Sequence, residues 1–127
     1  MIYGIGTDLV EVARIRAAHE RFGARFAPRI LMPEELAQFA RARDPVRFLA
    51  MRFAAKEALS KAMGTGFRQG VWVRDVGMVQ ERSGRPVPVF SARIRARLDA
   101  AGAGAGYVSL SDEAGMVVAV AIILMRA

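Results

Sequence analysis

The chain has 127 residues, of which 54% are hydrophobic, and it carries a formal net charge of +7 without any cysteine. Its length suits one domain with its own core, its hydrophobic content excludes a disordered protein, and the lack of cysteine excludes disulfides and thiolate catalysis. The positive charge favours an anionic partner, such as nucleic acid, a phosphorylated small molecule or an acidic protein, without choosing among them. We expect a single cytoplasmic domain over residues 1–127.

The first half of the chain predicts one strand followed by three helices. Glycines in the strand allow a close approach to a neighbouring element. The helices are delimited by a proline in the first turn, a capping aspartate and terminal glycines. The expected ranges are residues 2–7 for the strand and residues 9–22, from 33 and 45–63 for the helices.

The second half predicts two strands, a helix and two more strands. Residues 116–125 are ten consecutive apolar residues, too few for a membrane-spanning helix of about 20 residues. We therefore expect a strand that is covered on both faces. The order β-ααα-ββ-α-ββ is typical of an α+β domain with a largely antiparallel sheet. The expected ranges are 71–79, 85–90 (an edge strand, because of its prolines), 92–100, 107–110 and 115–124, with a flexible connection at 101–106.

The third predicted helix has an unusual polar side. At about 100° per residue, two apolar side chains, Leu49 and Phe53, lie among the polar ones. An ordinary surface helix would have no apolar residues there, so this side should face something other than bulk water. The polar residues on this arc are Arg52, Lys56, Glu57, Ser60 and Lys61, and Gly64 and Gly66 end the helix.

Two carboxylates are candidates for a metal site. Asp8 follows the first predicted strand and Glu57 lies in the long helix, so the two converge if the strand packs on the helix. Mg²⁺ binds one or two carboxylates and completes its coordination with water and phosphate oxygens, while Lys61 would reach a phosphate as a point charge. Simpler explanations stay open: Asp8 and Glu11 form a capping box, and Glu57 and Lys61 form an ordinary i,i+4 ion pair.

The first predicted helix carries a basic stripe. Arg14, Arg21 and Arg25 recur at steps of seven and four residues without acidic partners. Arginines on one helix face are usually solvated, but an unneutralised stripe is also a candidate for docking an acidic protein surface.

Two segments together resemble a known family. Residues 4–15 (GIGTDLVEVARI) and 48–66 (FLAMRFAAKEALSKAMGTG) closely resemble the signature blocks of the holo-[acyl-carrier-protein] synthases, which are small bacterial 4′-phosphopantetheinyl transferases. The resemblance extends through the Gly84-Arg-Pro86 turn and residues 108–113. It implies an α+β transferase that moves the 4′-phosphopantetheine group of coenzyme A to a serine of apo-acyl carrier protein in fatty acid biosynthesis. The products would be holo-carrier protein and adenosine 3′,5′-bisphosphate.

The resemblance also assigns roles to individual residues. It implies a Mg²⁺-dependent enzyme that forms homotrimers with a site at each subunit interface, which would place Leu49 and Phe53 against a neighbouring subunit or the nucleotide. It implies neither a nucleic-acid nor a membrane partner. The implied metal ligands are Asp8 and Glu57, the phosphate-contacting lysine is Lys61, the nucleotide positions are Arg52, Ser60, Gly64, Gly66 and Pro86, and the carrier-protein positions are Arg14 and Arg21.

One residue departs from the family pattern. Many members carry a histidine at the position of Asp112, where it helps to hold the 3′-phosphate of coenzyme A. An aspartate cannot donate that contact, so Arg47, Arg82 or Arg85 are candidates to replace it.

Two other functions are alternatives to the transferase. One is a basic nucleic-acid-binding α+β domain, which leaves Asp8 and Glu57 unexplained, and the other is a non-catalytic coenzyme A binder.

Overall fold

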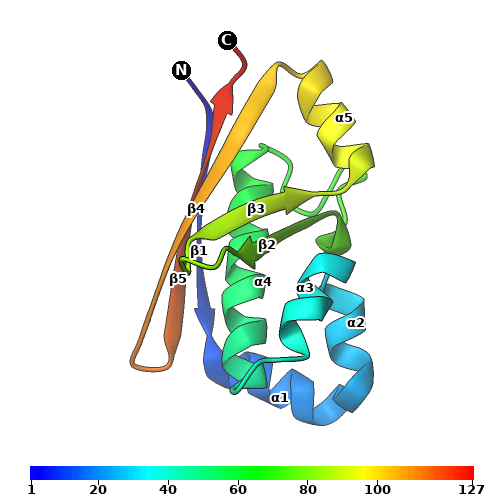
Figure 1. Cartoon of the computed structure of the whole chain (residues 1–127), viewed down its shortest axis with the longest axis vertical. Helices are drawn as coiled ribbons and strands as arrows, with labels where there is room; N and C mark the ends of the chain where they lie inside the picture. Colours follow the sequence, from blue (N-terminus) through cyan, green and yellow to red (C-terminus); the bar gives the residue numbers. More distant parts are fainter.

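A long helix, α4 (Pro45–Ala62), lies in the middle of the molecule with strands on two of its sides (Figure 1). This computed structural model describes all residues, 1–127. On one side of α4, three long antiparallel strands lie in the order β1 (Ile2–Glu11), β5 (Met116–Met125) and β4 (Ala103–Glu113). On another side lies an antiparallel pair, β2 (Val76–Gln80) and β3 (Pro86–Phe90). The predicted α+β class with antiparallel sheets is confirmed.

Four shorter helices complete the fold. Three of them follow β1 and lie below and beside α4 in Figure 1, and the fourth joins β3 to β4. None of the helices is long and apolar enough to cross a membrane. The helices are α1 (Val12–Phe22), α2 (Phe26–Ile30), α3 (Pro33–Phe39) and α5 (Ala92–Ala100), with single 3₁₀ turns at Gly23–Arg25 and Val73–Asp75.

The N-terminal strand is longer than the sequence predicted. It continues to Glu11, because its pairing with β5 runs without interruption from Gly4 to Glu11 and includes Asp8 opposite Ala119. Helix α1 therefore begins at Val12, and its N-cap residue Glu11 makes no side-chain capping hydrogen bond. The capping box expected for Asp8 and Glu11 does not form.

Two further boundaries differ from the prediction. Residues 101–106 are not a flexible connection as a whole, because β4 begins at Ala103 and pairs there with Met125 of β5. Helix α2 was not predicted, since its five residues are too few to show a helical period.

Strand β1 packs directly on α4 because both elements carry small residues at the contact. A Cβ on Gly4 would lie 1.9 Å from the carbonyl oxygen of Ala62, and one on Gly6 would lie 1.9 Å from the carbonyl oxygen of Ala58. No side chain larger than hydrogen fits at these two positions. The backbone of β1 consequently lies against the C-terminal half of α4.

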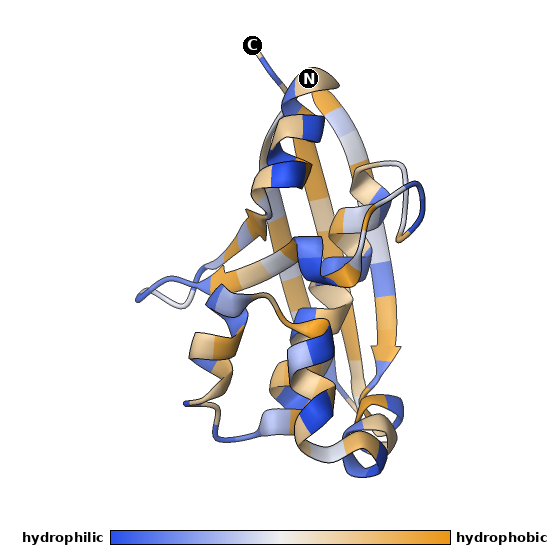
Figure 2. Ribbon diagram, turned by 90° about the vertical axis from the view of Figure 1, so that its right-hand side faces the viewer, coloured by the Kyte–Doolittle hydropathy of each residue, from blue (hydrophilic) through white to orange (hydrophobic).

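The three-stranded sheet has one covered face and one open face. In β5, Val117, Ala119, Ala121 and Ile123 are fully buried, while Val118 is 40% exposed. The expectation that this strand is covered on both faces is therefore wrong for the single chain, because side chains alternate between the faces and only one face packs on α4. Figure 2 shows the hydrophobic stretches along these long strands. The exposed apolar residues of this sheet include Ile5, Leu9, Tyr107, Val118 and Val120.

Candidate active site

The packing of β1 on α4 brings Asp8 and Glu57 to one cavity. Its volume is about 340 Å³. Asp8 comes from the middle of β1 and Glu57 from the fourth turn of α4, and both side chains are partly accessible. The convergence predicted for these two carboxylates is therefore present. The cavity is also lined by Leu9, Val10, Glu11, Arg14, Ile15, Phe53 and Met116.

Lys61 lies one turn after Glu57 and bonds to β1. Its Nζ lies 3.2 Å from Oδ1 of Asp8 and donates a hydrogen bond of 3.0 Å to the carbonyl oxygen of Thr7. The side chain of Lys61 is half exposed, whereas that of Asp8 is 15% exposed. Lys61 thus pairs across the β1–α4 contact with Asp8, and the simple i,i+4 pair with Glu57 is not formed.

The carboxylate of Glu57 lies in an unfavourable environment for its charge. Burial raises the pKa of Glu57, the charge of Asp8 raises it further, and the charge of Lys61 lowers it. Two carboxylates that repel each other in one cavity are the donor set that Mg²⁺ prefers. Since no group of three or more His, Asp or Glu side chains is gathered here, an ion would need further oxygen ligands from water or a bound phosphate. The residues fit such an ion.

The residues after Lys61 form a helix terminus with two left-handed glycines. Gly64 and Gly66 have φ angles of 86° and 59°, a region that side-chain-bearing residues rarely adopt. Their N–H groups donate to the carbonyl oxygens of Lys61 and Ser60. These two N–H groups end the helix, as a C-terminal turn must satisfy the last carbonyls, and they are therefore not free for a ligand.

The polar side of α4 is buried, as its apolar neighbours predicted, but by this chain itself. Arg52 is 3% exposed, while Lys56 and Ser60 are fully buried. The Ser60 hydroxyl donates to the carbonyl oxygen of Glu57 at 2.8 Å. Leu49 is 1% exposed and belongs to the core, so the expectation that it faces a nucleotide or subunit is wrong. Phe53, in contrast, lines the cavity of Asp8 and Glu57.

Arg52 lies at a second, basic cavity of about 240 Å³. Arg47, also on this wall, forms a two-pronged ion pair with Asp112, with distances of 2.8 Å and 2.9 Å. The Asp112 carboxylate thus binds two of the Arg47 nitrogens. Their hydrogen bonding raises the pKa of Arg47 and lowers that of Asp112. The cavity is lined by Ala42, Arg43, Asp44, Arg47, Phe48, Met51, Arg52 and Gln80.

The remaining predicted residues lie elsewhere on the surface. Pro86 begins β3 and lines a groove with Arg85 and Tyr107. Arg14 lines the Asp8 cavity from α1, and Arg21 lies two turns further on that helix, 5.3 Å from the centre of the Phe22 ring. Arg25 belongs to the 3₁₀ turn after α1, so the predicted arginine stripe ends at Arg21.

The sequence did not predict a role for two residues next to these cavities, the buried Glu35 and the partly buried Gln38. Glu35 looked like an ordinary acidic residue in the first turn of α3, and Gln38 had no distinguishing neighbour. Both contact α4 and β2, through partners that lie 14 to 43 residues away in the chain. The only sequence signal was that Glu35 is an acidic residue close to a run of core positions. An acidic residue in the first turn of a helix is equally explained by its favourable interaction with the helix dipole.

Comparison with known proteins identifies the family. The family model for the 4′-phosphopantetheinyl transferase superfamily matches residues 4–111. The chain is 48% identical over 124 residues to the holo-[acyl-carrier-protein] synthase of Halorhodospira halophila, covering 98% of both proteins. It is 45% identical over 122 residues to that of Neisseria meningitidis, covering 96% of this chain and 98% of the relative.

Solved structures agree with the sequence relatives. A crystal structure of the synthase from Neisseria meningitidis matches with a TM-score of 0.91 and 44% identity over 97% of this chain and 98% of that one. The Helicobacter pylori synthase, solved in complex with coenzyme A, matches with a TM-score of 0.81 and 29% identity over 94% and 98% of the two chains. The chain belongs to the 4′-phosphopantetheinyl transferase superfamily and, within it, to the holo-[acyl-carrier-protein] synthases, and it is an enzyme.

Proposed function

We propose that this enzyme transfers the 4′-phosphopantetheine group of coenzyme A to a serine of apo-acyl carrier protein and releases adenosine 3′,5′-bisphosphate. The observation that carries the proposal is the meeting of Asp8 and Glu57 at one cavity, with Lys61 paired to Asp8, in a chain whose relatives are holo-[acyl-carrier-protein] synthases. The transfer forms a bond between the serine oxygen and the β-phosphorus of coenzyme A and breaks the pyrophosphate bond. We place it in the cytoplasm, in fatty acid biosynthesis.

The reaction calls mainly for positioning and for neutralisation of phosphate charge. Asp8 and Glu57 would hold Mg²⁺, which when bound neutralises the pyrophosphate oxygens. Lys61 is already oriented by Asp8 and the Thr7 carbonyl, and its ammonium group stabilises the departing phosphate. Asp8, directly or through a water, accepts the proton of the attacking serine.

Besides the pyrophosphate, coenzyme A carries one further phosphate group, the 3′-phosphate of its nucleotide end, which needs cationic partners. The basic cavity is lined by three arginines, Arg43, Arg47 and Arg52. Guanidinium groups bind phosphate through two parallel hydrogen bonds. We assign the 3′-phosphate to this cavity, with Arg47 in the role that a histidine plays in many family members. Gly64, Gly66 and Pro86 are retained as proposed nucleotide positions, whereas the fully buried Ser60 would support them only from inside α4.

The carrier protein would dock on α1. Arg14 lies at the rim of the Asp8 cavity and Arg21 two turns further along the same helix. An acidic surface placed on these arginines delivers its serine next to the two carboxylates. The overall charge of +7 favours the encounter with an acidic protein.

A homotrimer would cover the open face of the three-stranded sheet. Leu9 is 63% exposed and Ile5 57% exposed on this face, and contiguous exposed apolar residues on a sheet are typical of protein interfaces. Leu9 also lines the Asp8 cavity, so a neighbouring subunit on this face would complete the wall of the site.

The decisive experiment combines the protein with apo-acyl carrier protein, coenzyme A and Mg²⁺ and weighs the carrier protein by mass spectrometry. We expect the mass of one phosphopantetheine group to be added, and adenosine 3′,5′-bisphosphate to appear in equal amount by chromatography. Omission of Mg²⁺, with chelator present, should abolish the transfer. If the carrier protein gains no mass where an established transferase modifies it, the proposed function is wrong.

A further inference from the structure

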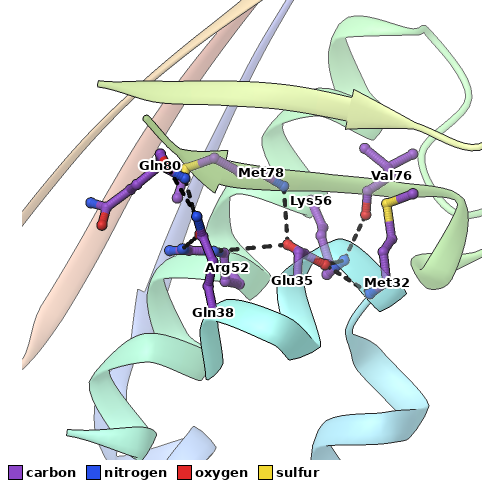
Figure 3. Close-up of polar contacts among 8 residues, drawn as sticks. All are labelled: Met32, Glu35, Gln38, Arg52, Lys56, Val76, Met78 and Gln80. Atoms are coloured by element: carbon purple, nitrogen blue, oxygen red, sulfur yellow. Dashed lines mark hydrogen bonds and ion pairs between the residues drawn. The ribbon is translucent and has the colours of Figure 1, made fainter. Parts of the chain in front are cut away.

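The outer edge of β2 is completed by side chains instead of a strand (Figure 3). The N–H of Met78 donates to Oε2 of Glu35 at 3.0 Å, and the N–H of Gln80 donates to Oε1 of Gln38 at 3.0 Å. Gln38 returns a hydrogen bond of 2.9 Å from its Nε2 to the carbonyl oxygen of Gln80. Helix α3 therefore binds β2 through Glu35 and Gln38, one turn apart.

Glu35 is a carboxylate with no access to water. Its side chain is 0% exposed and forms an ion pair with Lys56, whose side chain is also 0% exposed. Oε1 of Glu35 accepts a further hydrogen bond of 3.0 Å from the N–H of Met32. Gly77 leaves room for this group, because a Cβ there would lie 2.6 Å from the Glu35 carboxyl carbon. The carboxylate is thus held in place from three elements: α3, α4 and β2.

Arg52 connects this buried group to the basic cavity. Its Nη2 donates to Oε1 of Gln38 at 2.9 Å, its Nε lies 4.0 Å from Oε2 of Glu35, and its guanidinium lies 4.0 Å from the centre of the Phe48 ring. Burial lowers the pKa of Arg52 to about 10, and the charge of Glu35 opposes that effect. Arg52 therefore stays charged at neutral pH, although its side chain is only 4% exposed.

Arg52 is not fully satisfied by these contacts. Its Nε is buried without any hydrogen-bond acceptor, and Lys56 already forms the close ion pair with Glu35. A purely structural cation would be expected to find partners for its donors. The Arg52 Nε lies 4.0 Å from Oε2 of Glu35, so the single carboxylate of Glu35 faces two cations and leaves one positive charge without a counter-charge. An anion in the cavity that Arg52 lines together with Arg43 and Arg47 would supply it.

We propose that Glu35 and Gln38 are positioning residues for coenzyme A binding, which hold the Arg52 guanidinium at the wall of the basic cavity for a phosphate of the nucleotide. Gln38 fixes one end of the guanidinium by a direct hydrogen bond, and Glu35 supplies the negative charge behind it. This inference rests on the proposed function, since it takes the phosphate to be one of coenzyme A. Neither residue touches the transferred group.

The test compares Glu35→Gln with Glu34→Gln, the same change at the exposed neighbouring position on α3. We expect Glu35→Gln to weaken the binding of adenosine 3′,5′-bisphosphate, measured by calorimetry, by about tenfold or more, as for a lost charge-assisted contact. The KM for coenzyme A should rise by a similar factor while kcat changes less than about twofold. Glu34→Gln should leave both values unchanged. A merely structural role for Glu35 would not separate KM from kcat.

Two further variants keep the test informative if Glu35→Gln folds poorly because Lys56 loses its buried partner. The pair Glu35→Gln with Lys56→Met removes both buried charges together, which folded proteins tolerate better than the loss of one. Gln38→Met removes only the hydrogen bond to Arg52 and the contacts to Gln80. Both should weaken nucleotide binding.

A double-variant cycle separates positioning from an independent effect. If Glu35 acts through Arg52, Glu35→Gln should weaken nucleotide binding no further once Arg52→Gln is present. Full additivity of the two changes, or unchanged binding in Glu35→Gln and Gln38→Met, would overturn the inference. A wild-type protein that transfers no phosphopantetheine contradicts the proposed function instead, so the two failures are distinguishable.

Discussion

At the scale of single residues, Asp8 and Glu57 share one cavity and Lys61 places its charge between β1 and α4. Asp8 has two tasks in this arrangement, because it both carries a carboxylate into the cavity and holds Lys61. Glu57 has no ion-pair partner of its own, and its raised pKa reflects burial and the nearby Asp8. Each carboxylate is therefore open to test by an amide of the same shape.

Asp8→Asn and Glu57→Gln should each reduce the transfer rate by more than roughly 100-fold. Loss of a residue that only hydrogen-bonds to a metal ligand already costs roughly 10- to 100-fold. The reason is that each change removes a charged oxygen ligand from the proposed Mg²⁺ site. Initial rates at several Mg²⁺ concentrations, with circular dichroism to verify folding, measure the effect. Glu113→Gln, at the exposed end of β4, is the control and should keep full activity. Full activity in either site variant contradicts the metal assignment.

The ion pair of Arg47 with Asp112 predicts a pH effect. The hydrogen bond from Arg47 lowers the pKa of Asp112 in the folded state, so the stability from this pair is present above the unfolded Asp pKa of about 3.9 and is lost as pH falls through the lower folded value. Arg47→Gln should return the Asp112 pKa toward its ordinary value, measured by NMR titration of the carboxyl carbon. An unchanged Asp112 pKa would show that the pair does not form in solution.

At the scale of elements, the contact between β1 and α4 positions the site. Gly6 lies against α4 so closely that a Cβ would meet the Ala58 carbonyl oxygen at 1.9 Å and the Ala62 nitrogen at 2.6 Å. Asp8 is two residues further along the same strand, while Glu57 and Lys61 lie in the adjacent turns of α4. The spacing of this contact therefore sets the geometry of the candidate active site.

Gly6→Ala should destabilise the fold by about 1–3 kcal/mol, as expected for overpacking, which corresponds to a fall in Tm of roughly 4–12 °C. The strand must move away from the helix to accept the methyl group, so transfer activity should also fall. Differential scanning calorimetry and the mass-spectrometric assay measure the two effects. Gly104→Ala is the matched control, since a Cβ there has no neighbour closer than 3.5 Å. Equal Tm values for the two variants would contradict this prediction.

Local signals explain which elements could be predicted from the sequence. Asp44 caps α4 by accepting the N–H of Arg47, Pro33 opens α3, and Ser91 caps α5 by accepting the N–H of Ile94. Each of these signals acts within four residues, so it is readable without the fold. The end of β1 was misplaced because β5, more than one hundred residues later, provides its hydrogen-bond partners.

The residues of the candidate site likewise divide into those that the sequence could predict and those that only the fold reveals. Asp8, Glu57 and Lys61 were found because their residue types and the family resemblance point to phosphate chemistry. The roles of Glu35 and Leu49 were missed, since only tertiary packing decides that a first-turn glutamate is buried and that a leucine among charges faces the core. Burial of this kind depends on which helix covers which strand, which no local pattern encodes.

At the scale of the whole molecule, the open face of the three-stranded sheet predicts assembly. In wild-type protein, light scattering after size-exclusion chromatography should give three times the 13.8 kDa of one chain. Val120→Lys places a charge on the middle of this face, where Val120 is 39% exposed, and should shift the mass to that of one chain, because a charge buried without a partner is costly.

The control for this experiment is Ala37→Lys, on the exposed side of α3, which should leave the assembly intact. If the site lies between subunits, Val120→Lys should also lose most of its transfer activity. A wild-type protein with the mass of one chain, or a Val120→Lys variant with the wild-type mass, would show that this face is not the interface.

The small sheet of β2 and β3 has a consequence for behaviour in concentrated solution. On the outer edge of β2, the N–H groups of Met78 and Gln80 are occupied by the side chains of α3. On β3, Pro88 pairs with Met78 and Pro86 pairs with Gln80. Proline has no backbone N–H, so neither position can donate a hydrogen bond. A strand from another molecule would find few free donors on either edge. We therefore expect this hairpin not to start edge-to-edge aggregation, even when the protein is crowded.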